Sequence, residues 1–271
     1  METDINILII FDKVHKIIIT PFTDINEQLM YLKNLGIDIL DNDPDNSIIS
    51  RKIYQFIYKF YNENTCRGDT MNTCNSTFGT NNYRILDIIN KQNISEENKI
   101  KIMNKIDEFR HIFYYIGNFT VLECSHKNSI NTARGSYWGK LRDSWPLTLL
   151  CIQDYLSNYS LIEENPIKYS FETKEAQTFF QYYSESENGF EKFCDDHYLS
   201  QKFYNNSSDL AYVKELSNGK YEVNLDLFDG LSLSKPLPMN IVEIEQYIDR
   251  VTKKIIARGK IMLQKYMNNN I

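Results

Sequence analysis

The sequence predicts an α+β domain in which helices dominate and strands are few and short. Most apolar runs recur at helical spacing and begin at a good N-cap residue, whereas the alternating or β-branched runs are brief. These brief runs do not alternate regularly with the helices, as they would in a sheet built from βαβ units. The 271 residues, 42% of them hydrophobic, suffice for a single domain over 1–271 with a substantial core.

The N-terminal section begins with two β-branched runs, residues 5–11 and 16–20, which predict a hairpin or two neighbouring strands. A helix is expected over 24–35, where Gly36 ends it. Apolar residues then recur every three or four positions over 47–62, which predicts an amphipathic helix.

The middle of the chain predicts more helices around one strand. A helix is expected over 85–90, and a longer one from an N-cap at Ser95 to about Phe113. The β-branched and aromatic run 119–124 predicts a strand, and 147–155 predicts a further helix.

The C-terminal part contains clear capping and turn signals. Thr173 is a suitable N-cap for a helix, and the next helix carries one apolar face that ends at His197 and Tyr198. Asn218-Gly219, between two alternating runs within 211–227, predicts a β-hairpin.

The last helix is expected to be long. Asn240 and Glu243 have the spacing of a capping pattern, and the helix should run to about Tyr266. Its predicted buried stripe consists of Ile244, Tyr247, Ile248, Val251 and Ile255.

Composition and charge limit the classes of function. The net charge of −6 and the pI of about 5.4 argue against broad, non-specific binding to nucleic-acid phosphates. No apolar run has the roughly 18 residues of a membrane helix, so no membrane partner is expected. Five cysteines, an odd number without a framework spacing, suit reduced thiols and predict a cytoplasmic protein.

Two irregular segments, 65–83 and 125–144, are the candidate functional regions, because compact domains seldom keep long loops without a use for them. Arg67 and Arg134 have the fork geometry that binds a phosphate or carboxylate. Asn72 and Asn118 are expected to position the ligand.

Three further residues are the candidates for catalysis. Asp69 and Asp143 could hold a cation or act as a base, and Asn131 would position the reacting group. Asp143 would also orient Arg134. The alternative is that all these side chains satisfy one another and the loop backbones, with Arg134 paired to Asp143.

Several short runs resemble a family of uncharacterised bacterial proteins that carry a domain of unknown function. The resemblance extends from Arg67 to about Met262 and leaves Met1–Tyr61 outside it. Its runs are Gly68-Asp69-Thr70, Ile116-Gly117-Asn118-Phe119, Ile130-Asn131-Thr132-Ala133-Arg134-Gly135, Trp145-Pro146-Leu147-Thr148-Leu149, Leu237-Pro238 and Ala257-Arg258-Gly259. This resemblance supports the two segments as one site but implies no reaction.

A partial second resemblance is more chemical. Residues 116–122, followed by Asn128 or Asn131, look like the distal half of an HNH-type nuclease domain of the GmrSD kind. Such a site holds one divalent metal, which stabilises the phosphate while a histidine activates water. The catalytic histidine run expected upstream is absent here, and only Asp69 lies at a suitable distance.

The sequence therefore leaves two functions open. One is a polar pocket for a phosphorylated ligand or nucleic acid; if the chain is an enzyme, metal-dependent phosphodiester cleavage in genome defence comes first. The other is a non-enzymatic protein-interaction module with ordered loops. A divalent metal fits the first function, whereas zinc is disfavoured because Cys66, Cys74, Cys124 and His126 match no known zinc spacing.

Overall fold

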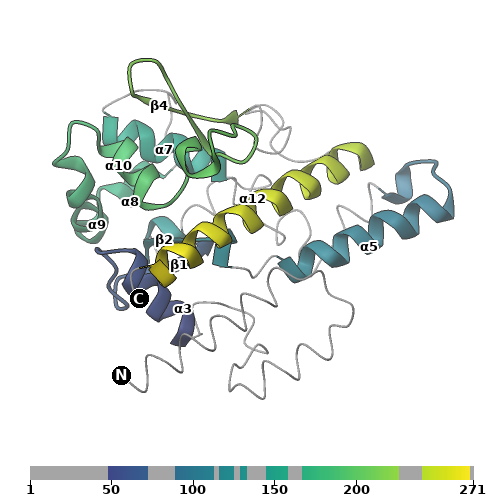
Figure 1. The fold of residues 1–271 in the computed structure, drawn as a ribbon, viewed down its shortest axis with the longest axis horizontal. Coiled ribbons are helices and arrows are strands. Elements are labelled where there is room, and N and C mark those ends of the chain that lie inside the picture. Colours follow the sequence, from purple (N-terminus) through teal and green to yellow (C-terminus); the bar gives the residue numbers. More distant parts are fainter. Residues whose placement is uncertain are drawn as a thin grey trace.

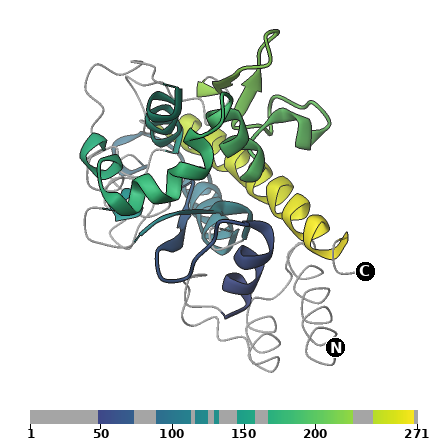
Figure 2. The same cartoon turned by 90° about the vertical axis from the view of Figure 1, so that its left-hand side faces the viewer.

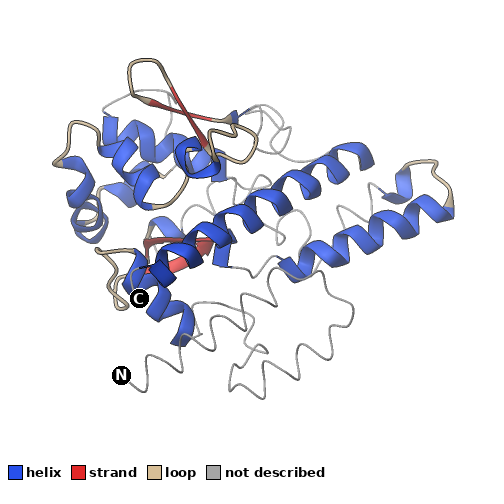
Figure 3. Cartoon of the chain, in the orientation of Figure 1, coloured by secondary structure: helices blue, strands red, loops and turns tan. Residues whose placement is uncertain are grey.

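A computed structural model gives the fold. It describes residues 48–72, 89–112, 116–124, 129–132, 145–157, 167–225 and 240–268. Helices dominate, and the strands form two separate two-stranded antiparallel sheets, which confirms the predicted α+β class (Figure 3). None of the helices described is both long and apolar enough to cross a membrane. The elements predicted over 5–35 lie outside the described residues.

Helix α3, Ile48–Ile57, is shorter than the predicted helix 47–62. After it the chain forms a turn in which the carbonyl of Asn62 accepts from the amides of Thr65 and Cys66, at 3.1 and 2.8 Å. The Asn62 side chain also accepts from the amide of Asn64, at 2.9 Å. The helix has ended before this point, in a turn where the amide of Tyr61 donates to the carbonyl of Tyr58 at 2.9 Å. The local bonds of Asn62 then keep the chain from resuming the helix.

The predicted loop 65–83 begins instead with a strand, and in this respect the prediction was wrong. Strand β1, Cys66–Thr70, pairs antiparallel with β2, Phe119–Glu123, so that Arg67 lies opposite Leu122 and Asp69 opposite Thr120. The β1 residues are small or polar and show no alternating apolar pattern. Pairing with β2, a strand buried along its whole length, specifies β1 as a strand.

The 3-10 helix η2, Ile116–Asn118, leads directly into β2. The β2 strand confirms the prediction for 119–124 to within one residue. In the second irregular segment, residues 130–132 form a helical turn; residues 125–128 and 133–144 are not among those described.

Helices α5, Glu96–Ile112, and α12, Ile241–Asn268, lie side by side (Figure 1). Both predicted caps are confirmed: Ser95 Oγ accepts from the amide of Asn98 at 3.3 Å, and Asn240 Oδ1 accepts from the amide of Glu243 at 2.9 Å. The predicted stripe of α12 is buried and forms a separate hydrophobic cluster with α5.

The two helices run parallel, as their ion pairs show. Lys101 pairs with Glu245 at 4.0 Å, and Lys105 pairs with Asp249 at 2.7 Å. Because both partners advance by one helical turn in the same direction, α5 and α12 have the same polarity. We call this apolar contact, with ion pairs along its edge, the helical seam.

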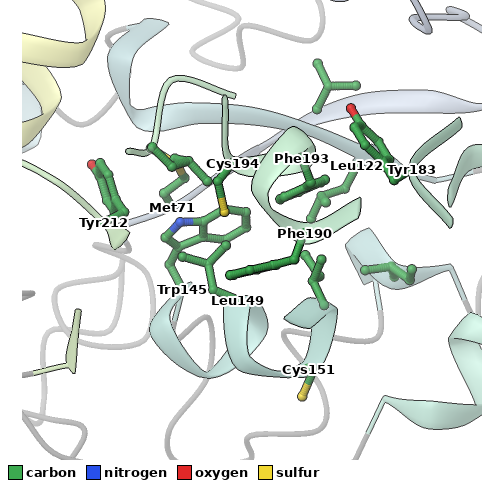
Figure 4. Close-up of a cluster of buried hydrophobic side chains, with 14 of the residues drawn as sticks. Met71, Leu122, Trp145, Leu149, Cys151, Tyr183, Phe190, Phe193, Cys194 and Tyr212 are labelled. Carbon is green, nitrogen blue, oxygen red and sulfur yellow. The ribbon is translucent and has the colours of Figure 1, made fainter. Parts of the chain in front are cut away.

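The larger hydrophobic cluster fills a group of helices beside the seam (Figure 2). These helices are α7, Trp145–Ser157; α8, Lys168–Phe171; α9, Lys174–Ser184; and α10, Gly189–Asp196. The predicted cap of α9 is confirmed, since Thr173 Oγ1 accepts from the amide of Ala176 at 3.2 Å. Phe190 and Cys194 of α10 are directed toward Trp145 and Leu149 of α7 (Figure 4).

The predicted hairpin is confirmed near the end of this group. After the 3-10 helix η4, Gln201–Tyr204, strands β3, Val213–Glu215, and β4, Tyr221–Val223, pair antiparallel around Gly219. Gly219 has φ of 78°, which glycine adopts without steric cost. Tyr221 donates to Asp195 Oδ1 at 2.9 Å and so fastens the hairpin to α10.

Candidate functional site

Buried polar side chains gather where α12 meets η2, β2, the end of α10 and the residue after α3. Each of them is at most 2% exposed. We call this set the polar junction; it consists of Tyr58, Asn72, Asn118, Thr120, His197 and Arg258. Buried polar groups are costly unless hydrogen-bonded, so the partners of each one decide what the junction does.

A glycine lets α12 approach this region closely. A Cβ atom at Gly117 would clash with the carbonyl oxygen of Ile255 and lie 2.6 Å from the amide nitrogen of Gly259. The backbone of η2 therefore lies directly against the backbone of α12. Two of the short runs from the sequence, Ile116–Phe119 and Ala257–Gly259, thus meet face to face.

Because α12 and η2 lie this close, the Arg258 side chain can donate hydrogen bonds to four separate segments. Its Nη1 donates to the carbonyls of Gly117 and Phe119, at 3.0 and 2.6 Å, and its Nε donates to the carbonyl of His197 at 2.9 Å. Its Nη2 donates to the hydroxyl of Tyr58 at 3.0 Å. All four acceptors are neutral, so within the described residues this buried guanidinium has no carboxylate partner.

Thr120, His197 and Tyr58 lie together beside Arg258. Thr120 Oγ1 lies 2.8 Å from His197 Nδ1, and the ring of Tyr58 packs edge-on against the imidazole, with 5.0 Å between centroids. Burial, followed by the charge of Arg258, holds the pKa of His197 well below its ordinary value, so the imidazole is neutral. Burial also raises the pKa of Tyr58, although the nearby Arg258 opposes that rise.

Asn72 and Asn118, two of the predicted ligand-binding residues, bond to one another. Asn118 Oδ1 accepts from the amide of Asn72 at 2.9 Å and from its Nδ2 at 3.1 Å, and Asn118 Nδ2 donates to the carbonyl of Asn72 at 2.9 Å. The Asn118 side chain thereby acts as a strand partner just beyond the β1–β2 ladder. Asn72 Nδ2 also reaches the hydroxyl of Tyr212 at 3.3 Å.

Arg67 and Asp69 lie on one face of β1, because they are two residues apart on a strand. Both are partly exposed. Arg67 Nη1 donates to the carbonyl of Glu63 and, at 3.5 Å, to that of Cys66. Asp69 Oδ1 accepts from the amide of Thr70 at 2.8 Å, a local bond that does not fix its role.

Asn131 is carried by the turn 130–132 and is partly exposed. The turn is tied to β2, because the amide of Ile130 donates to Oε2 of the buried Glu123 at 3.2 Å. Arg134 and Asp143, the remaining predicted site residues, lie outside the described residues. The structure thus brings Asn72 and Asn118 together, places Arg67 and Asp69 on one strand, and connects Asn131 to its partner strand.

The sequence left a divalent metal possible and disfavoured zinc. Over the described parts of the chain, no three His, Cys, Asp or Glu side chains gather closely enough to hold a metal ion. Cys66 is buried, which raises the pKa of its thiol, and Cys124 is half-buried. Cys74 and His126 are not among the residues described.

The sequence did not indicate Arg258 as a site residue, and it placed His197 only at the end of an apolar helix face. A signal for Arg258 was present, because Val251, Ile255 and Met262 continue the buried stripe of α12 at helical spacing and Arg258 falls within it. A charged residue on an apolar stripe needs buried partners. The identity of those partners, up to 200 residues away along the chain, was not visible in any local pattern.

The fold and junction define a mostly helical α+β domain organised around a buried arginine. The chain belongs to a family described as a family of unknown function (DUF6994), whose model matches residues 56–262. The match confirms the resemblance to a domain of unknown function, and it begins earlier than the Arg67 expected from the short runs. Comparison with curated proteins and with solved structures finds no match.

Proposed function

We propose that this domain binds a phosphorylated ligand, a small molecule or a nucleic-acid end, on the face of β1 that carries Arg67 and Asp69. One observation carries the proposal. Arg67 is a partly exposed arginine whose position is set by a neutral carbonyl, that of Glu63, and it forms no ion pair with any described carboxylate.

The guanidinium of Arg67 retains a free edge. Its Nη1 is occupied by the carbonyls of Glu63 and Cys66, whereas its Nε and Nη2 have no partner among the described residues. Two parallel N–H donors of one guanidinium match two oxygens of a phosphate, and such bidentate bonds are among the stronger ones in proteins. The contact to Glu63 lowers the entropy that Arg67 would lose on binding.

The remaining predicted residues complete the proposed site. Asp69, one strand step along the same face, would hold a cation or orient the ligand. The turn that carries Asn131 is fastened to Glu123, whose side chain projects to the opposite face of the sheet, so Asn131 would contribute only to a ligand that extends around the edge of the sheet. Arg134 would be a second anion contact, oriented by Asp143. If the ligand is a nucleic acid, we propose metal-assisted phosphodiester cleavage, with Asp69 and Asp143 holding the divalent ion, as the reaction to test first.

A binding measurement with inorganic pyrophosphate tests the site. Arg67→Gln should weaken binding by about tenfold to a hundredfold, the loss expected for hydrogen bonds to a charged group. Lys253→Gln is the matched control, because it removes the same charge from an exposed position on α12 and should bind like the wild type. The proposal fails if the wild type binds neither pyrophosphate nor a 5′-phosphorylated oligonucleotide.

The cleavage step has its own test. Plasmid DNA and total RNA are incubated with the protein, with and without magnesium or manganese, beside Asn131→Ala and Arg134→Ala. Metal-dependent cleavage that both substitutions abolish supports a nuclease, and with it a role in genome defence. Cleavage that survives in both variants points to a contaminant and removes the nuclease proposal while leaving ligand binding intact.

A second candidate is a non-enzymatic interaction module. The observation in its favour is the mutual pairing of Asn72 and Asn118, which leaves two of the predicted ligand contacts occupied by each other. Under this alternative, Arg67→Gln leaves the affinity for small ligands unchanged. Another protein would then bind the surface of the domain.

A further inference from the structure

Two arginines contact the same glutamate at the proposed site. Arg67 Nη1 donates to the backbone carbonyl of Glu63, and Arg51 Nη1, carried by α3, lies 4.0 Å from the carboxylate oxygen Oε2 of Glu63. Helix α3 and strand β1 therefore each place one guanidinium beside Glu63, which lies in the segment that connects them.

The contact between Arg51 and Glu63 is weak. A separation of 4.0 Å is too long for a hydrogen bond, and the side chains of Arg51 and Glu63 are 35% and 52% exposed. An ion pair this exposed contributes little to stability. Among the described residues the Nε of Arg51 has no hydrogen-bond partner and its Nη1 has only this long contact, so the fork of Arg51 is not committed to any acceptor.

The charge of this part of the chain favours an anion. Residues 48–72 include four basic and two acidic residues, a net charge of +2, although the whole chain carries −6. The two acidic residues are Glu63 and Asp69. Asp69 accepts a hydrogen bond from the amide of Thr70, whereas the Glu63 carboxylate has only the long contact to Arg51 among the described residues. Glu63 is thus the carboxylate that an anion beside Arg51 has to replace.

We propose that the ligand carries two adjacent phosphate groups and that Arg51 binds the second of them. The inference rests on the proposed function, since Arg67 would bind the first phosphate. The second phosphate takes the place of the Glu63 carboxylate beside Arg51, and that carboxylate turns toward solvent. The backbone carbonyl of Glu63 keeps its place in this exchange, so it continues to position Arg67.

Two separate positions for negative charge distinguish a diphosphate from a single phosphate. Arg67 lies at the backbone end of Glu63, and Arg51 lies at its carboxylate end. A single phosphate bound to the free edge of Arg67 would leave Arg51 facing Glu63. A diphosphate offers oxygens at both of its ends, and each guanidinium then forms its own charge-assisted hydrogen bonds.

Calorimetric titration with inorganic pyrophosphate and with orthophosphate tests the inference. The wild type should bind pyrophosphate about tenfold or more tightly than orthophosphate, because only pyrophosphate reaches both arginines. Arg51→Gln should weaken pyrophosphate binding about tenfold while its affinity for orthophosphate stays within about twofold of the wild type. Arg67→Gln, in contrast, should weaken the binding of both ions.

Two further variants separate a specific contact from a general loss of charge. Lys59→Gln removes a positive charge from an exposed position in the same section of the chain. Because the charge of Lys59 acts on Asp196, this variant should bind pyrophosphate like the wild type. Glu63→Gln removes the carboxylate that competes with the second phosphate, and it should strengthen pyrophosphate binding about two- to fivefold.

The outcomes separate this inference from the proposed function. If Arg67→Gln loses binding while Arg51→Gln keeps the wild-type affinity for pyrophosphate, the role of Arg51 is wrong and the Arg67 site stands. The diphosphate is likewise excluded if Arg51→Gln weakens the binding of both ions equally. If the wild type binds neither pyrophosphate nor a 5′-phosphorylated oligonucleotide, both proposals fall. Should Arg51→Gln not fold, Glu63→Gln decides: stronger pyrophosphate binding supports the inference, and unchanged binding removes it.

Discussion

The polar junction and the helical seam are both buried contacts of α12, yet they are built on opposite principles. In the seam, apolar side chains of α5 and α12 fill the interior and the charged residues pair along its exposed edge. In the junction, Arg258 is buried and its charge meets only carbonyls and a hydroxyl. The seam gains stability from area removed from water, whereas the junction depends on the hydrogen bonds among its buried polar groups.

This contrast predicts where the fold tolerates substitution. An apolar seam loses stability roughly in proportion to the side-chain volume removed. A polar junction fails when one member is lost, because the others are left buried and unpaired. Substitutions in the two regions should therefore differ in size and in their dependence on pH and salt.

The largest effect is expected for Gly117→Ala. The added Cβ would clash with backbone atoms of α12, which cannot move aside as a flexible side chain can. We expect a loss of more than about 4 kcal/mol in the free energy of unfolding, measured by urea denaturation. Gly259→Ala is the control from the other side of the contact; its Cβ meets nothing nearer than 3.4 Å and should cost little.

Arg258→Met follows. It preserves much of the side-chain volume but leaves the carbonyls of Gly117, Phe119 and His197 without their donor. We expect a loss of about 3–5 kcal/mol, with Arg258→Lys in between because it keeps the charge and loses the fork. A variant as stable as the wild type would show that the buried charge costs as much as its bonds contribute.

In the seam, Ile106→Ala should cost about 2–5 kcal/mol, the usual range for a buried isoleucine. Ile106 is 1% exposed and packs in the α5–α12 cluster. Ile100, on the same helix but 60% exposed, is the matched control, and Ile100→Ala should stay within about 0.5 kcal/mol of the wild type. Equal effects at both positions would contradict the arrangement of α5.

Acid should weaken the junction and not the seam. The folded pKa of His197 lies well below its ordinary 6.5, so the unfolded chain binds more protons than the folded one below that pH. Stability contributed by neutral His197 is complete above about pH 6.5 and falls by up to about 1.4 kcal/mol per pH unit on acidification. Urea midpoints from pH 7 to 5 measure this slope, which His197→Gln should remove.

The smallest effect is expected at the edge of the seam. Lys105 pairs with Asp249 at 2.7 Å, and both side chains reach solvent. Lys105→Met should therefore change the free energy of unfolding by less than about 1 kcal/mol, and added salt should reduce the difference further. Lys101→Met, where the pair distance is 4.0 Å, should have no measurable effect.

Much of the helical framework was predictable, because its signals are local. The caps at Ser95, Thr173 and Asn240 and the turn at Gly219 all lie within a few residues of the structure they specify. The strand β1 was not predictable, since its polar residues carry no alternating pattern. It becomes a strand only by pairing with β2, more than 40 residues later along the chain.

The candidate site was predictable only in part. Arg67, Asp69 and Asn131 were recognised from residue type, and they remain candidates on or beside the same small sheet. Asn72 and Asn118 were recognised as a polar group, but their mutual bonds depend on the register of β1 against β2. The position of His197 over Thr120 depends on the packing of α10 against β2, for which the sequence contains no local signal.

The class of fold, the ends of most helices and the apolar stripes of the seam could all be inferred from the amino-acid sequence, because they follow from spacing within a few turns of chain. The contacts of Arg258 with η2, β2, α10 and Tyr58, and the contact of His197 with Thr120 of the sheet, are set by tertiary packing. Those contacts join residues up to 200 positions apart. They form only when the backbones of Gly117 and α12 come together, and that approach requires the whole fold.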